Sequence, residues 1–229
     1  MLQRVMAAAV MIWSATLSAE EAAKECPPGM ARVPGGAFTP AGKPHVTVPD
    51  LCMDATEVTV AQYAACTTCT APKTTEFCNW GVKGKDDHPV NCVTWAQSDA
   101  YCKAQGKRLP TEWEWEWAAR GGVEGWARPW GKESAEGRLC WKRYSMVKAK
   151  SFGTCPAASF PQGDSPQGIH DLAGNVWEWT SSAAGPGTRV FRGSGWRIST
   201  ANSILSGMRV DHAASGQFFD LGFRCVKEP

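Results

Sequence analysis

The stretch R-L-P-T-E-W-E-W-E-W-A-A-R-G-G, residues Arg108–Gly122, decides how this part of the chain folds. Its alternation of charged and indole side chains has the period of a β-strand. We nevertheless predict a helix from Thr111 onwards. Pro110 precedes a capping box, in which the Thr111 hydroxyl and the Glu114 side chain satisfy exposed backbone N–H groups. The helix is expected to stop at Gly121, because glycine adopts the left-handed C-terminal conformation at little cost.

Two other segments carry the same helix-start signal. Thr59 with Gln62, and Thr94 with Gln97, form capping boxes before short helical patterns. The second of these helices is expected to stop at Gly106. Elsewhere 23 glycines and 15 prolines interrupt the chain, so strands should be short and loops long. The pattern predicts a loop-rich α+β domain.

The N-terminus has the features of an export signal. Met1–Arg4 supplies one positive charge, Val5–Leu17 is uncharged and mostly apolar, and small residues follow near Ser18 and Ala19. We therefore predict a signal peptide over residues 1–19. The apolar run is about a dozen residues, short of the roughly twenty that cross a bilayer, so we expect no stable membrane span. An uncleaved N-terminal anchor is the alternative.

Ten cysteines behind a signal peptide predict a disulfide framework and a periplasmic or secreted protein. The C-x-x-C of Cys66 and Cys69 could instead hold zinc or carry redox chemistry. Against zinc, no second C-x-x-C or spaced histidine pair completes four ligands. Against redox chemistry, the Thr-rich surroundings lack a βαβ pattern. A net charge of +2 gives no basic field for nucleic acid.

Seven short motifs run in order along nearly the whole chain after the signal peptide. They are M-x-R-V-P-G-G-x-F at 30–38, D-x-T-E-V-T at 54–59, H-P-V-N-C-V-T-W at 88–95, the opening stretch at 108–122, G-I-H-D-L-A-G-N-V-W-E-W-T at 168–180, R-V-F-R-G-S-G-W at 189–196 and L-G-F-R-C at 221–225. Together they resemble the formylglycine-generating enzyme family, also called the sulfatase-modifying factor domain, over residues 26–229. The resemblance implies one irregular, elaborated C-type-lectin-like α+β domain with disulfides.

The resemblance also implies one disulfide pairing. The family links the cysteine after its D-A-Y motif to the one ending G-F-R-C, which here are Cys102 and Cys225. Cys140 and Cys155 form a second expected pair, by proximity alone. The sequence does not pair the other six: Cys26, Cys52, Cys66, Cys69, Cys78 and Cys92.

Four positions resemble a calcium site of the family. They are Asp171, Gly174, Val176 and Glu178. Calcium takes about six to eight oxygen ligands, and this turn offers two carboxylates and exposed backbone carbonyls. We expect a structural calcium ion, with an acidic turn satisfied by hydrogen bonds or an arginine as the alternative. The family's other calcium site is not expected, because Leu139 stands where an asparagine is needed.

Members that make formylglycine bind copper(I) through two cysteine thiolates with four residues between them, shortly after an R-G-G-S segment. Aligning Arg192–Trp196 with that segment places Ile198 and Ser203 at the two positions. No cysteine lies between Cys155 and Cys225, so copper is not expected. A second group of relatives needs clustered histidines to hold iron. The four histidines here are scattered along the chain, at His45, His88, His170 and His212.

Two functions remain open on this reading. The leading one is an exported domain without formylglycine-generating oxidase activity, a binding or accessory module for a protein or peptide partner. The alternative is a periplasmic oxidoreductase or protein-maturation enzyme with a non-standard site. No catalytic residue is assigned, and the oligomeric state is not predicted. Trp177, Trp196 and Arg197 are candidates to line the former substrate groove, with core packing as the alternative for the tryptophans.

Overall fold

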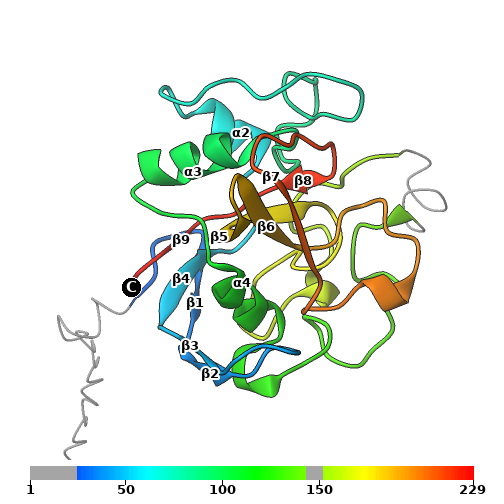
Figure 1. The fold of residues 1–229 in the computed structure, drawn as a ribbon. Coiled ribbons are helices and arrows are strands. Elements are labelled where there is room, and N and C mark those ends of the chain that lie inside the picture. The colour runs from blue at the N-terminus through cyan, green and yellow to red at the C-terminus, as the bar shows by residue number, and fades with distance from the viewer. Residues whose placement is uncertain (1–24, 143–151) are drawn as a thin grey trace, which may run out of the picture.

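The computed structural model describes residues 25–142 and 152–229 (Figure 1). The signal peptide predicted at residues 1–19 therefore lies outside the described residues. In the described part the strands are β1 (Met30–Val33), β2 (Gly36–Phe38), β3 (Val46–Val48), β4 (Leu51–Asp54), β5 (Trp177–Gly185), β6 (Thr188–Gly193), β7 (Arg209–Ala213), β8 (Leu221–Gly222) and β9 (Val226–Lys227). The α-helices are α2 (Val60–Ala64), α3 (Trp95–Ala104) and α4 (Glu112–Ala119).

All three predicted helices are confirmed. Each begins after its threonine, and the reciprocal hydrogen bonds of the capping box are present in all three. Gly106 and Gly121 follow α3 and α4 with φ of +65° and +73°, the left-handed conformation expected of them. In α4 the alternation of glutamate and tryptophan does not separate an exposed face from a buried one. Trp115 and Trp117 lie in the core, and the glutamates between and before them are buried as well.

The strands form three small sheets. β1, β4 and β9 form one, in the order β1-β4-β9; β2 and β3 form a hairpin; the largest runs β7-β6-β5-β8. All pairs are antiparallel except β5 with β8. In Figure 1, α2 and α3 lie above the largest sheet. Helix α4 lies between that sheet and the β2–β3 hairpin. The segments between these elements are long, so the fold is the loop-rich α+β type that the sequence predicts.

Five disulfides hold these loops. They join Cys26 to Cys52, Cys66 to Cys69, Cys78 to Cys92, Cys102 to Cys225, and Cys140 to Cys155. The last two are the pairs expected from the sequence, and the Cys102–Cys225 bridge connects α3 to the C-terminal end of the fold. All ten cysteines lie in the described residues and none is free. Over the same residues, no helix is both long and apolar enough to cross a membrane.

Candidate functional site

A fully buried ion pair joins Arg224 to Glu178. The arginine Nε lies 2.7 Å from one carboxylate oxygen, and its Nη2 lies 2.7 Å from the other. Trp115 donates its indole N–H to the same carboxylate at 2.7 Å. The guanidinium also donates to the carbonyls of Asp54 at 3.1 Å and His170 at 2.8 Å. Arg224 therefore ties the end of β4 and the turn before Asp171 to the start of β5.

Glu57 lies beside this pair without a hydrogen-bond partner. Its side chain is fully buried, and neither carboxylate oxygen receives a hydrogen bond from any described residue. Burial raises the pKa of Glu57 well above its ordinary value, and the charges of Asp171 and Glu178 raise it further, while Arg224 opposes them. The residue's own backbone N–H also favours the ionised form, but it is the weakest of these influences, so burial dominates and favours the protonated carboxyl.

Asp171 is the third buried carboxylate of the cluster. One of its oxygens accepts the backbone N–H of Ala158 at 2.6 Å. Burial raises the pKa of Asp171 from 3.8 to about 6, against the opposing effects of that hydrogen bond and of Arg224. Three carboxylates and one guanidinium leave an excess of two negative charges if all are ionised. Such charges are costly in an interior unless a proton or a cation neutralises them.

The turn between Asp171 and Glu178, where the sequence predicts a calcium ion, is shaped by a glycine. Gly174 has φ of +84°, and a Cβ there would lie 2.5 Å from the carbonyl oxygen of Cys140, so only glycine fits. Among the described residues, no three His, Cys, Asp or Glu side chains converge closely enough to hold an ion unaided. Backbone carbonyls such as those of Gly174 and Val176 would have to complete the ligand set, as is common for calcium.

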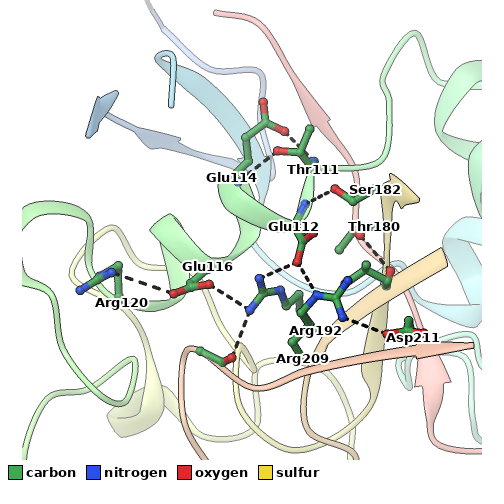
Figure 2. A network of polar contacts seen from close by, with 12 residues as sticks. Thr111, Glu112, Glu114, Glu116, Arg120, Thr180, Ser182, Arg192, Arg209 and Asp211 are labelled. Carbon is green, nitrogen blue, oxygen red and sulfur yellow. Dashed lines mark hydrogen bonds and ion pairs between the residues drawn. The ribbon is translucent and has the colours of Figure 1, made fainter. Parts of the chain in front are cut away.

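The segment that follows β6 is positioned by a second buried network, shown in Figure 2. Arg192, 1% exposed, donates to Glu112 at 2.8 Å and pairs with Glu116 at 2.9 Å. Arg209 donates to the same oxygen of Glu112 at 2.9 Å. Gly193 follows with φ of +88°, and a Cβ there would lie 3.1 Å from the Trp115 ring. The network fixes the end of β6 against α4, and thereby the path of residues 194–197.

Trp196 and Arg197 line a hollow of about 400 Å³ with Phe77, Lys142, Phe152 and Phe219. We call it the Trp196 hollow. Trp196 is 4% exposed and donates its indole N–H to the carbonyl of Phe219 at 3.3 Å. The guanidinium of Arg197 lies over the Phe219 ring, 5.0 Å from its centroid. Trp196 is therefore buried in the core and also lines this hollow.

Trp177 does not share that hollow. It lines a second one of about 270 Å³, with Phe191, Val210, His212, Phe218, Asp220 and Leu221, which we call the Trp177 hollow. Gly195 packs against the residues that form it: a Cβ at Gly195 would lie 2.8 Å from the Asp220 Cβ and 3.0 Å from Trp177. The structure thus divides the three groove candidates between two hollows.

Ile198 and Ser203 stand where copper-binding thiols would be needed. Ile198 packs against the apolar cluster of Trp130, Leu139 and Ile204. The Ser203 hydroxyl lies 3.1 Å from that of Thr200, within a short 3₁₀ turn. With every cysteine in a disulfide, no thiolate is present beside Trp196.

The four histidines have separate environments. His88 is buried, its Nδ1 lies 2.8 Å from the Thr154 hydroxyl, and burial lowers its pKa to about 4. His170 lies 2.8 Å from Asp164. His45 lies 3.2 Å from the Thr39 hydroxyl, and His212 packs edge-on against Phe218. The described structure brings no two of them into one site.

Sequence reasoning missed Glu57 and Asp220. Glu57 is part of the quoted D-x-T-E-V-T motif, but no spacing in the sequence signals that its carboxylate is buried beside Asp171. Asp220 precedes the L-G-F-R-C motif directly and carries no pattern of its own. Each of the two residues gains its environment only in the folded chain, from residues that are distant in the sequence.

The short sheets, long loops and disulfides define an elaborated C-type-lectin-like domain. The chain belongs to the sulfatase-modifying factor family: the family described as "Sulfatase-modifying factor enzyme 1-like domain" matches residues 15–229. This agrees with the resemblance read from the seven motifs.

The relatives include proteins named as formylglycine-generating enzymes and proteins named as inactive forms. The chain is 39% identical over 160 residues to "Inactive C-alpha-formylglycine-generating enzyme 2" of Bos taurus, covering 64% of this chain and 52% of that protein. It is 35% identical over 175 residues to "Formylglycine-generating enzyme" of Streptomyces coelicolor, covering 64% and 55%. It thus spans about half the length of these relatives. The solved structure of PvdO from Pseudomonas aeruginosa shares the fold, with TM-score 0.69 and 22% identity over 87% of this chain and 94% of that one.

Proposed function

We propose that this chain is an exported member of the family without formylglycine-generating activity, acting as a binding or accessory module for a protein or peptide partner. The observation that carries the proposal is the state of the cysteines. Copper(I) prefers soft thiolate ligands, whereas all ten cysteines here are in disulfides and the two expected ligand positions hold Ile198 and Ser203. Similarity to a relative described as inactive supports the same conclusion.

The Trp196 hollow is the proposed partner site. Phe77 and Phe152 are 40% and 54% exposed at its rim, an unusual exposure for phenylalanine. Lys142 and Arg197 add two positive charges to this aromatic surface. Aromatic rings and arginine are enriched where proteins bind other proteins. The combination favours an extended peptide segment that presents an apolar side chain next to a carboxylate.

Calcium is proposed as a structural ion at the cluster of Glu57, Asp171 and Glu178. The excess of buried negative charge and the unpartnered oxygens of Glu57 support this assignment. Bound there, the ion would supply positive charge to a dry interior. The residues of the chain would hold the 171–178 turn against β5 and Arg224. The ion has no proposed role in bond making or breaking.

A periplasmic or extracellular location is part of the same proposal. Five disulfides need an oxidising compartment to form and persist. The N-terminal pattern over residues 1–19 points to export through a signal peptide.

The test is an activity assay with a matched positive control. The mature protein is incubated with copper and a peptide carrying C-x-P-x-R, in parallel with the Streptomyces coelicolor relative, and the peptide mass is measured. We expect conversion of the cysteine by the relative and an unchanged mass with this chain. Formylglycine formation by this chain would overturn the proposal.

Binding is measured separately by titrating a fluorescent acidic peptide library into the same protein. We expect selected peptides to bind the parent and to bind Phe152→Ser or Lys142→Gln several-fold more weakly. The exposed Phe77 allows a second rim variant, Phe77→Ser. Failure of every library member to bind, or equal binding by all three variants, would remove the Trp196 hollow from the proposal.

A further inference from the structure

The walls of the Trp177 hollow are aromatic. The Trp177 and Phe191 rings meet edge to face, with centroids 5.4 Å apart and planes at 76°. Phe218 forms a third wall, and Val210 and Leu221 complete the apolar lining. Neighbouring strands bring these residues together, because Phe191 pairs with Val210 across β6–β7 and Trp177 with Leu221 across β5–β8. The hollow is therefore built on the largest sheet, whose strands fix its shape.

One acidic residue, Asp220, belongs to this apolar lining. Asp220 is half-buried, and within the described residues it forms no ion pair. Burial raises the pKa of Asp220, while the charge of Arg197 and the residue's own backbone N–H favour the ionised form. Arg197 itself belongs to the lining of the Trp196 hollow. His212 is the other titratable group at the Trp177 hollow, and it packs against Phe218 with ring centroids 4.8 Å apart.

We propose that the Trp177 hollow binds a small organic cation that carries an alkylated ammonium group. The negative faces of aromatic rings attract such cations, and the attraction grows when the ligand leaves water. The carboxylate of Asp220 supplies the opposite charge at the same hollow. The methyl groups of a quaternary ammonium suit the apolar walls, whereas a primary ammonium is strongly hydrated and costs more to desolvate.

The dimensions favour a headgroup rather than a long chain. A volume of about 270 Å³ lies just below the roughly 300 Å³ at which pockets for drug-sized ligands begin. Choline is thus a suitable probe, and its neutral carbon isostere, 3,3-dimethylbutan-1-ol, has almost the same shape without the charge. The comparison separates recognition of charge from simple burial of an apolar group.

The first experiment titrates choline and the isostere into the folded chain by calorimetry, with chemical shifts of the tryptophan N–H groups as a second readout. We expect one saturable choline site and binding of the isostere about tenfold weaker, equivalent to about 1.4 kcal/mol. Equal binding of the two compounds would mean an apolar pocket and would overturn the proposal. Absence of saturable choline binding would do so as well.

Three variants place the site. Asp220→Asn keeps the shape and removes the charge, and Phe218→Leu keeps an apolar side chain and removes the ring; each should weaken choline binding about tenfold or more. Asp211→Asn is the matched control, because it removes a carboxylate that lies on β7 and pairs with Arg209. It should bind choline as the parent does. Unchanged binding in Asp220→Asn, or an equal loss in Asp211→Asn, would refute the assignment.

Unfolding curves of the three variants show whether a loss of binding is a loss of structure. Phe218 packs against the main core, so Asp220→Asn is the decisive variant if Phe218→Leu unfolds early. This site is independent of the proposed function, since Lys142 and Phe152 lie in the other hollow. Choline binding can therefore fail while peptide binding succeeds, and the reverse.

Discussion

Arg224 meets Glu178 through two contacts of 2.7 Å, in a place that solvent does not reach. The two residues come from the fifth and the last of the seven motifs by sequence order, yet they form one buried charged unit. Both charged groups are removed from water. The carboxylate is instead bound by the guanidinium and by the indole N–H of Trp115, so the loss of either charged group would leave the other buried without its counter-charge.

Replacing Arg224 by Met should lower the free energy of unfolding by about 3–5 kcal/mol, because Glu178 would be left as an uncompensated buried charge. Urea unfolding measures the change. The matched control is Arg32→Met, which breaks an exposed pair with Asp50 and should cost about 1 kcal/mol or less. The double variant Arg224→Met, Glu178→Leu should recover part of the loss, since it removes both charges. A single variant no worse than the control would contradict the role given to this pair.

Calcium should raise the midpoint of thermal unfolding of the parent chain by mass action, with magnesium less effective because it demands a tighter octahedral site. Glu57→Gln should abolish most of this calcium effect. In the presence of a chelator it should be at least as stable as the parent, because one of the crowded buried charges is gone. The exposed Glu76→Gln serves as control. If calcium has the same effect on Glu57→Gln as on the parent, Glu57 takes no part in the site.

Without calcium, Asp171 should make the chain less stable as the pH rises from about 4 to about 6. Its pKa is raised from 3.8 to about 6 in the folded state, so over that window the folded state holds a proton that the unfolded state has lost. The free energy of unfolding must then fall with rising pH. Asp171→Asn removes this contribution and tolerates the residue's φ of +56°.

The measurement is the difference in unfolding free energy between parent and Asp171→Asn at several pH values in a chelator. Carboxylates remote from Asp171, such as Glu114 with its lowered pKa, contribute equally to both proteins and cancel. Glu57 does not cancel, because the Asp171 charge raises its pKa, so both proteins also carry Glu57→Gln. A difference that is flat between pH 4 and 6 would show that Asp171 titrates normally. With Glu57 retained, saturating calcium should flatten the difference, since the ion competes with the proton.

Removing the Cys102–Cys225 disulfide should destabilise the fold far more than removing the Cys66–Cys69 disulfide. The two bridges span sequence separations of 123 and 3. The chain-entropy model gives about 5 kcal/mol for the long loop and about 2 kcal/mol for the short one. Paired Cys→Ala variants and urea unfolding test the ranking. Equal losses would mean that local packing, and not loop closure, sets the contribution.

Local hydrogen bonding made the helices predictable. The hydroxyl of Thr111 and the side chain of Glu114 lie three positions apart in the chain, so their capping box is visible in the sequence. The pairing of Cys26 with Cys52 is different, because it depends on β1 lying beside β4. That register is a property of the assembled sheet.

The candidate sites were predictable only in part, for the same reason. Trp177 and Trp196 belong to quoted motifs, but the close packing of Gly195 against Asp220 separates their hollows. Glu57 could be recognised only as part of a motif, because the charged residues that act on it, Arg224 and Asp171, are more than a hundred residues away in the sequence. A site built from residues that are far apart in the sequence has no short motif by which it could be recognised.

The bridge between Cys102 and Cys225 also changes how the molecule carries mechanical load. Tension applied to the C-terminal end is transmitted from Val226 to Cys225 and then through the disulfide to Cys102 in α3. The chain between the two cysteines therefore bears no tension. At the other end, the Cys26–Cys52 bridge shields the first strand in the same way. Under force, only the stretches outside the bridged loops can lengthen. The Trp177 hollow would keep its shape, because its lining lies between Cys102 and Cys225. The Trp196 hollow would not be shielded in the same way, because Phe77 lies on the loaded stretch between Cys69 and Cys78.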